Sequence, residues 1–474
     1  MIPPGAPPVP GFRDSLRRIA PLAWPVFVGQ VSVVAFGTVD TLFVARHAAA
    51  DLAALSVGAA AYVTVFIGLM GVVLAVSPIA GRLFGAGRLA EAGGQLHQAV
   101  WIALALALLG STLLVFPAPF LALSKAPPEV AAKVRGYLLA LSLSLPASLL
   151  FAAFRGFNTA VSRPKAVMVL QLGGLLAVKL PLTALLVFGW PAAGLPALGV
   201  LGCGLATAAA MWAQLLAGAW LLRRDPFYAP FALPLAPGRP PLRAPDGAAI
   251  RAQLRLGVPM GLTILVEVTG FAFMAIFIAR LGTTAVAGHQ IAANLVALMF
   301  MMPLALGNAT GTLVAQAIGA QAGERARRIG WHGLWLGSGI ALAMGLAVFA
   351  ARGGVVRLYT GDAAVIAAAL PLLAWMALFH FADAVQGIAA FVLRAWHVAT
   401  VPVVIFVMAL WGVGLGGGYW LAFDPTGVVP PGLSGAPGYW AASTAGLVLA
   451  ALGLTALLAH TVRRGRGGRV TPGG

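Results

Sequence analysis

Twelve long runs of apolar residues, separated by shorter polar segments, fill most of the 474-residue chain. A helix needs about 20 consecutive, mostly apolar residues to cross the hydrocarbon core of a bilayer, which is about 30 Å thick. Each run is long enough. The sequence therefore predicts an all-α integral membrane protein with twelve transmembrane helices, over residues 20–45, 52–79, 96–120, 128–153, 166–190, 197–222, 256–280, 285–313, 330–351, 363–392, 399–421 and 438–461.

The composition agrees with a membrane protein. Hydrophobic residues make up 61% of the chain and charged residues only 9%, whereas soluble proteins carry about 25% charged residues. The net charge of +18 could indicate nucleic-acid binding, but the basic residues lie in the gaps between the apolar runs. We therefore expect a lipid bilayer, and no nucleic acid, as the partner.

The basic residues are distributed unevenly between the two sides of the predicted membrane. Of the 30 Lys and Arg residues, 22 lie on the side that holds both ends of the chain and seven on the other. Cytoplasmic loops of membrane proteins carry an excess of Lys and Arg. We therefore expect both termini in the cytoplasm and a location in a bacterial-type inner (plasma) membrane. We expect no cleaved signal before the first span, which we interpret as the anchor.

Two short motifs recur 234 residues apart. Leu22-Ala-Trp-Pro25 corresponds to Leu256-Gly-Val-Pro259, and the segment that begins at Gly81 corresponds to the segment that begins at Ala315. Each half then contains six spans, which predicts a parallel repeat with the binding site between or within two lobes. The predicted divisions are a cytoplasmic N-terminal tail (1–19), an N-lobe (20–222), a cytoplasmic linker rich in Pro, Gly and Arg (223–255), a C-lobe (256–461) and a cytoplasmic C-terminal tail (462–474).

Three acidic residues lie inside predicted spans: Asp40, Glu267 and Asp383. A carboxylate in lipid costs at least about 2.5 kcal/mol, so such residues normally face a cavity or a partner. Each acid has two possible roles. It is either structural, held by hydrogen bonds or located at a helix end from which it reaches the interface, or it belongs to a functional site. Such a site binds a proton, Na⁺ or a cationic substrate, and these compete for it. That competition, combined with rocking of two lobes, is sufficient for antiport.

Polar and aromatic residues accompany these acids. Gln290 and Asn294 share one face of the eighth span, and Gln386 follows Asp383 by three residues. Phe271 and Phe379 lie close to the acids in the sequence. Aromatic rings attract organic cations within about 6 Å, although packing against lipid or core is the plainer explanation for each ring. We predict that these residues contribute to a substrate cavity.

Lys179 is the one basic residue well inside a predicted span. It lies 14 residues after Lys165 and 11 before Trp190, roughly 16 Å or more from either end of the span. That depth hinders its stem from reaching the interface, so we predict a buried partner. Asp40 is the acid in the same half, and we expect the two to form an ion pair. Coupling would then depend on Glu267 and Asp383, with Asp40 gating or structural.

Motifs for nucleotide-driven or metal-dependent catalysis are absent from the sequence. It contains no HExxH, no paired CxxC and no phosphate-binding loop. We expect neither an enzyme nor a cofactor, and Na⁺ at Glu267 and Asp383 is the one metal ion that the pattern allows. The single cysteine excludes an intrachain disulfide.

The order and spacing of several motifs resemble the multidrug and toxic compound extrusion (MATE) family, in its NorM-like branch, over about residues 20 to 460. The motifs are Pro25, Gln30 and Val39-Asp40-Thr41 in the first span, Ser77-Pro78 and Gly85-Ala86-Gly87-Arg88 at the end of the second, Gly257-Val-Pro259 and Glu267 in the seventh, Gly288-His289-Gln290 in the eighth and Asp383-Ala-Val-Gln386-Gly387 in the tenth.

The resemblance implies cation-coupled export of small organic, often cationic, drug-like compounds, with H⁺ or Na⁺ as the coupling ion. It assigns the coupling role to Asp40, Glu267 and Asp383 and a supporting role to Gln290. We also predict that Gln30, from the motif in the first span, contributes to the substrate cavity. Two departures matter. Phe379 stands where NorM-like members often have Tyr, and the fifth span reads Lys179-Leu-Pro181-Leu-Thr183 where the family often has two Asn residues.

Two other functions are alternatives for a membrane protein of this kind. A lipid-linked saccharide flippase of a related superfamily would favour a strongly basic cavity. Lys179 is the only clearly basic residue within a predicted span, which argues against this function. A membrane prenyl transferase would need clustered acids such as DDxxD, and none of the twelve acids forms that motif. The sequence therefore favours an exporter, which we expect to act as a monomer.

Overall fold

The computed structural model describes residues 10–124, 127–233, 242–424 and 427–464. Within these ranges, twelve helices are long and apolar enough to cross a membrane. The predicted all-α fold with twelve spans is confirmed. The outer parts of both predicted tails and the middle of the predicted linker, 234–241, lie outside the described residues.

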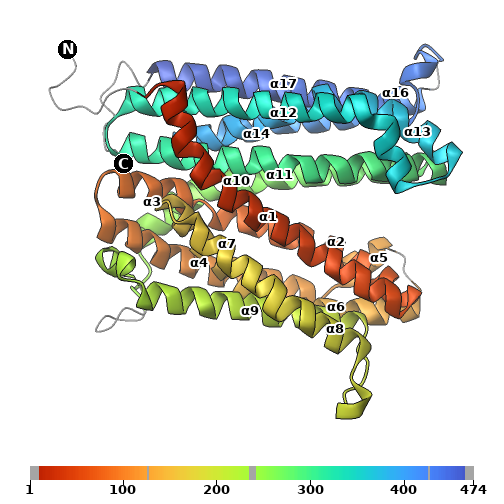
Figure 1. The fold of residues 1–474 in the computed structure, drawn as a ribbon, viewed down its shortest axis with the longest axis horizontal. Coiled ribbons are helices and arrows are strands. Elements are labelled where there is room, and N and C mark those ends of the chain that lie inside the picture. Colours follow the sequence, from red (N-terminus) through yellow and green to blue (C-terminus); the bar gives the residue numbers. More distant parts are fainter. Residues whose placement is uncertain (1–9, 125–126, 234–241, 425–426, 465–474) are drawn as a thin grey trace. The chain divides into compact units, whose positions relative to one another are not determined.

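The first six spans agree closely with the predicted runs. Span two divides near Leu74, and span five contains a π-helical segment. The spans are α1 (Phe12–His47), α2 with α3 (Ala49–Val73 and Val76–Gly85), α4 (Leu89–Val115), α6 (Pro128–Ala160), α7 with η1 and α8 (Pro164–Gly173, Gly174–Lys179 and Leu180–Phe188) and α9 (Val200–Arg224). A hairpin with an antiparallel bridge between Trp190 and Leu195 extends beyond α8 (Figure 1).

The last six spans follow the same pattern. The predicted run 363–392 consists of two helices that meet at Trp375, and span eleven contains a longer π-helical segment. These spans are α10 (Gly247–Ala279), α11 (Thr283–Gly319), α12 (Gly323–Tyr359), α13 with α14 (Ala363–Ala374 and Met376–Ala395), α15 with η4 and α16 (Thr400–Phe406, Val407–Gly417 and Gly418–Phe423) and α17 (Ala436–Arg464). Within the described residues, four short helices lie in connections: α5 (Ala118–Ser124), η2 (Pro191–Ala193), η3 (Pro226–Phe231) and η5 (Pro431–Leu433).

The chain folds into two compact units. The N-terminal unit is Val28–Gly261, and the C-terminal unit combines the chain from Leu262 with the part of α1 up to Phe27. The boundaries fall inside α1 and α10, so both helices contribute residues to both units.

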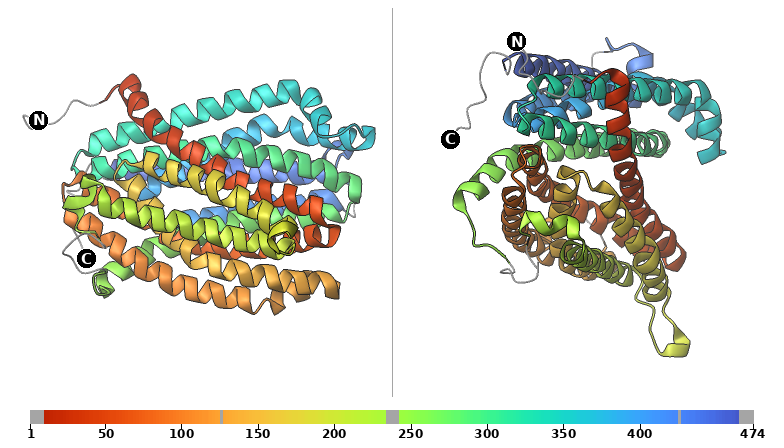
Figure 2. Two further views of the ribbon diagram at one scale, coloured as in Figure 1. Left: turned by 60° about the horizontal axis from the view of Figure 1, so that its bottom comes forward. Right: turned by 60° about the vertical axis from the view of Figure 1, so that its left-hand side comes forward.

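Each unit is built around one central helix. In the N-terminal unit α6 packs against α2, α4 and α9, and in the C-terminal unit α14 packs against α11, α12 and α17. Their most apolar windows are 78% and 72% buried, the highest shares among the twelve spans. Figure 1 shows these neighbours lying lengthwise beside one another within each unit, and Figure 2 shows the same for the green to blue helices of the C-terminal unit.

Small residues allow this close packing. A Cβ at Gly204 would lie 2.9 Å from the Cβ of Ala140, where α9 meets α6. A Cβ at Gly446 would lie 2.5 Å from the carbonyl oxygen of Ala409, where α17 meets η4. Lipid tails are as apolar as the side chains, so membrane helices gain most from such close backbone approach.

Four turns between spans share one geometry. Gly87, Ser162, Gln321 and His397 each have a positive φ, between +56° and +74°. In each turn, the backbone N–H of the following residue donates a hydrogen bond to the carbonyl oxygen five residues earlier. An example is the bond from the N–H of Arg88 to the carbonyl oxygen of Leu83 (2.9 Å). This is the Schellman motif, which satisfies carbonyls at a helix end. Gly87 and Gln321 are 234 residues apart, the spacing of the repeated sequence motifs.

Candidate functional site

Two acidic side chains of the C-terminal unit converge on one amide. The Nε2 of Gln386 donates to Asp383 Oδ1 (2.9 Å) and to Glu267 Oε1 (3.2 Å). Asp383 and Gln386 share a face of α14 because they are three residues apart, and Glu267 reaches them from α10. Asp383 and Gln386 are buried, with 5% and 1% of their surface exposed. The structure thus brings together three residues that the sequence analysis selected from two spans.

No described basic side chain lies in direct contact with this pair, and the positive charge that acts on it is the guanidinium of Arg394 on α14, which attracts Glu267 electrostatically. Among the described residues, neither Glu267 nor Asp383 forms an ion pair with a basic side chain. The Oε1 of Gln386 is buried and has no hydrogen-bond partner in the described parts of the chain. Two carboxylates and an amide oxygen are hard ligands of the type that alkali and alkaline-earth cations prefer. The residues present therefore fit a proton or a small cation such as Na⁺.

A group of aromatic rings lies in the same unit. Phe379 packs against Trp440 with ring centroids 5.2 Å apart, and Phe271 lies 5.8 Å from His289. The indole N–H of Trp440 donates to Nδ1 of His289 (3.3 Å). Phe379 is buried, whereas Phe271 is partly exposed. Phe379 is thus a core residue in this structure, and Trp440, which holds the group together, was not selected from the sequence.

Gln290 and Asn294 form a polar pair, four residues apart, on α11. Gln290 and Asn294 are both exposed, and Asn294 Oδ1 accepts a hydrogen bond from the hydroxyl of Tyr359 (3.0 Å). Within the described residues, no hydrogen bond joins either side chain to Glu267 or Asp383. Their predicted role in a substrate cavity stays a prediction.

In the N-terminal unit, Asp40 of α1 forms an ion pair with Lys179 of η1. The Nζ of Lys179 also donates to Thr207 Oγ1 (2.6 Å) and to the carbonyl oxygen of Cys203 (3.3 Å), both on α9. The lysine side chain is fully buried. This acid therefore has a basic partner in its own unit, unlike Glu267 and Asp383.

Arg155 lies deeper in its span than the sequence predicts. The predicted fourth run ends at residue 153, but α6 continues to Ala160, so Arg155 lies inside the helix. Its guanidinium donates to Gln30 Oε1 (3.3 Å) and contacts the sulfur of Met70 (3.0 Å). Lys179 is therefore not the only base within a span. Arg155 gives the predicted cavity residue Gln30 a charged partner.

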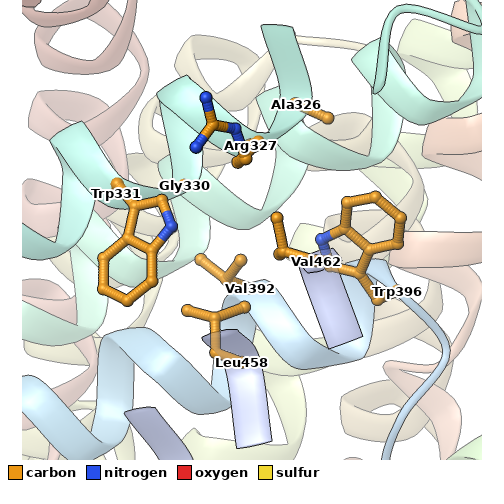
Figure 3. Close-up of a pocket in the computed structure, with 8 residues that line it drawn as sticks. All are labelled: Ala326, Arg327, Gly330, Trp331, Val392, Trp396, Leu458 and Val462. Atoms are coloured by element: carbon orange, nitrogen blue, oxygen red, sulfur yellow. The ribbon is translucent and has the colours of Figure 1, made fainter. Parts of the chain in front are cut away.

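A small pocket lies elsewhere in the C-terminal unit, between α12, α14 and α17. In Figure 3 the indole rings of Trp331 and Trp396 stand on either side of Val392, Leu458 and Val462. It is too narrow to hold a water-sized molecule. None of the predicted site residues lines it. Across the described residues, no group of three or more His, Cys, Asp or Glu side chains is close enough together to hold a metal ion.

Comparison with known proteins identifies the family. The MatE family model matches residues 25–185 and 259–420. The probable multidrug resistance protein NorM of Aromatoleum aromaticum is 41% identical over 445 residues, which cover 93% of each chain. This chain belongs to the MATE family. The two matched segments begin 234 residues apart, at the paired prolines Pro25 and Pro259.

Other relatives agree with this assignment. The multidrug resistance protein PmpM of Pseudomonas aeruginosa is 33% identical, over 96% of this chain and 93% of its own. The eukaryotic MATE transporter AtDTX14 has the same fold, with a TM-score of 0.83 at 17% identity over 97% of this chain and 99% of its own. The Vibrio cholerae MATE transporter VcmN has a TM-score of 0.82 at 19% identity, over 96% and 98%. These MATE relatives are named as transporters or resistance proteins, not enzymes.

Proposed function

We propose that this MATE family member is a cation-coupled antiporter, which exports small organic compounds in exchange for H⁺ or Na⁺. The observation that carries the proposal is the pair of carboxylates, Glu267 and Asp383, held by the single amide of Gln386. Membrane-embedded acids of this kind are expensive to keep and normally belong to ion or substrate pathways. The names of the relatives, multidrug resistance proteins, support organic drugs as the exported class.

The carboxylate pair provides a site for which two cations compete. Two ionised carboxylates that share one donor repel each other, and a small cation placed between them relieves that repulsion. An exported organic cation relieves it equally well. If only one of them binds at a time, and the site opens alternately to the two sides of the membrane, inward movement of the ion drives outward movement of the compound. Phe271, partly exposed beside this unit's aromatic group, is our candidate for contact with the organic part of the cargo.

Transport in proteoliposomes tests this function. A fluorescent organic cation is loaded, and its movement is followed under a pH gradient alone, a Na⁺ gradient alone, or no gradient. We expect movement against the dye gradient with one of the two ions and none without a gradient. Dye movement that ignores both gradients would contradict cation coupling.

We further propose an inner-membrane location with both termini in the cytoplasm, supported by the 22-to-7 distribution of basic residues. Cys203 is buried, so single cysteines can be introduced at exposed positions with little background. A cysteine at Ala248, at the start of α10, should react with a membrane-impermeant thiol reagent only from the cytoplasmic side. The matched cysteine at Ala197, in the hairpin after α8, should react only from outside. The reverse labelling would refute this orientation.

A further inference from the structure

The ammonium group of Lys179 is surrounded by three oxygen atoms of the N-terminal unit. They are a carboxylate oxygen of Asp40, the hydroxyl of Thr207 at 2.6 Å and the carbonyl oxygen of Cys203 at 3.3 Å. A lysine ammonium carries three N–H donors and no acceptor. Its hydrogen-bonding capacity therefore matches the number of oxygens around it.

These oxygens form the kind of pocket that holds a small cation. Cys203 and Thr207 are one helical turn apart on α9, and the Thr207 hydroxyl lies 3.1 Å from the Cys203 carbonyl oxygen, so both oxygens sit at one place on the helix. Asp40 supplies the negative charge from α1. A carboxylate, a carbonyl and a hydroxyl are hard oxygen ligands, the type that binds alkali and alkaline-earth cations. Here the centre of the pocket is occupied by a cation that belongs to the chain.

The backbone is shaped to place the lysine there. Lys179 is the last residue of η1, a π-helical segment that begins at Gly174. Single π-helical turns are frequent at functional sites. Pro181 has no N–H to donate, which favours such a local widening of the helix. A Cβ at Gly174 would lie 2.3 Å from Nε2 of Gln214 on α9, so a larger residue here would displace that buried side chain. The ammonium also lies 5.9 Å from the ring centroid of Phe36.

We propose that Lys179 is a tethered cation that permanently fills a cation pocket beside Asp40, so that the N-terminal unit exchanges no ion during transport. Leaving the pocket would separate a buried ion pair and strand both charges, which is strongly unfavourable. The filled pocket itself does not depend on the proposed cation coupling. Its consequence for transport rests on that proposed function: Glu267 and Asp383 alone then set the number of ions exchanged per cycle.

Equilibrium binding of ²²Na⁺ to purified full-length protein in detergent tests the pocket directly. The parent is Glu267→Gln/Asp383→Asn, in which the C-terminal acids are neutral, and binding is measured in mildly alkaline solution to limit competition from protons. We expect no saturable binding in the parent. Adding Lys179→Met empties the pocket, and we expect saturable binding of one Na⁺ per chain. Adding Asp40→Asn as well should abolish that binding.

Two further variants make the test robust. Lys179→Gln removes the tethered charge but keeps a polar group whose amide can donate to Asp40, so it tests the loss of the charge in a variant that is milder for folding. Thr207→Val in the emptied pocket should weaken the gained Na⁺ binding, whereas Thr207→Ser, which keeps the hydroxyl, should not.

Two results would overturn the proposal. One is Na⁺ binding by the parent that disappears with Asp40→Asn, since the lysine would then not fill the pocket. The other is folded, monodisperse Lys179→Met and Lys179→Gln proteins that bind no Na⁺. Because binding at equilibrium needs no transport, these results are independent of whether the protein couples export to an ion gradient.

Discussion

The two units bury their acids in different ways. In the N-terminal unit, Asp40 faces the ammonium of Lys179, so the charges cancel inside the protein. In the C-terminal unit, Glu267 and Asp383 share the neutral amide of Gln386, and no described base pairs with either. An acid with a built-in counter-ion is satisfied without an external cation, whereas two acids around one amide are not. The comparison teaches that position within a span is not sufficient to assign a coupling role.

The largest effect on transport is expected where no counter-ion is built in. Glu267→Gln and Asp383→Asn should each lower gradient-driven dye transport at least about 100-fold, or about 2.7 kcal/mol, because each removes a charge that the driving ion must neutralise. Each variant should remain folded, since the replacing amide keeps the shape of the acid. Initial transport rates in proteoliposomes measure this. Full gradient-driven transport by both variants would show that the acids of the C-terminal unit do not carry the coupling.

Removing the built-in counter-ion should damage stability more than it damages coupling. Lys179→Met leaves a buried carboxylate without its partner, which typically costs about 3–5 kcal/mol. Asp40→Asn/Lys179→Met removes both charges and should be markedly more stable than the single variant. Expression yield and thermal denaturation in detergent compare the two proteins. A double variant no better than the single one would mean that the ion pair does not hold these residues in place.

The shared amide should matter less than the acids that it bridges. Gln386→Leu removes the N–H donor that holds both carboxylates together and should lower the transport rate roughly tenfold, about 1.4 kcal/mol. Gln386→Asn keeps an amide on a shorter stem and is expected to fall between Gln386→Leu and the unaltered protein. Initial rates at saturating dye give the ranking. Unchanged transport by Gln386→Leu would show that the two acids act independently of the bridge.

The smallest expected effect sharpens the comparison at equivalent turns. The N-terminal unit has Gly87 at its left-handed position, whereas the C-terminal unit has Gln321 there, with φ +56°. A left-handed conformation costs a residue with a Cβ roughly 1–2 kcal/mol. Gln321→Gly should therefore raise the stability by about 1 kcal/mol and Gly87→Gln should lower it. Thermal denaturation of the two variants tests this. Changes in melting temperature that are equal in size and opposite in sign would indicate that the two turns are equivalent.

The fold could be predicted because lipid imposes a simple constraint. A chain that crosses a bilayer must satisfy its backbone within each helix, so long apolar runs translate directly into spans. The break at Trp375 and the π-helical segments η1 and η4 were not predicted, because they depend on packing between helices rather than on hydropathy.

The candidate site could be predicted only in part. Asp40, Glu267 and Asp383 stand out because a charge in an apolar run is unusual, and the depth of Lys179 pointed to a partner in its own half. Thr207, Trp440 and Arg155 gave no such signal. Thr207 and Trp440 are ordinary residues of membrane helices, and Arg155 looked like a flanking residue because α6 extends beyond its apolar run. Their contacts arise from helices far apart in the sequence.

The ratio of ions to substrate in reconstituted transport tests the account most directly. An outward substrate gradient is imposed on proteoliposomes, and the opposing flux of H⁺ or ²²Na⁺ is counted per substrate molecule. We predict that Asp40→Asn/Lys179→Met retains the ratio of the unaltered protein, even if its rate is lower, and that Glu267→Gln shows no ion flux. Loss of ion flux in the Asp40→Asn/Lys179→Met protein, with an unchanged ratio in Glu267→Gln, would contradict the assignment of coupling to the C-terminal unit.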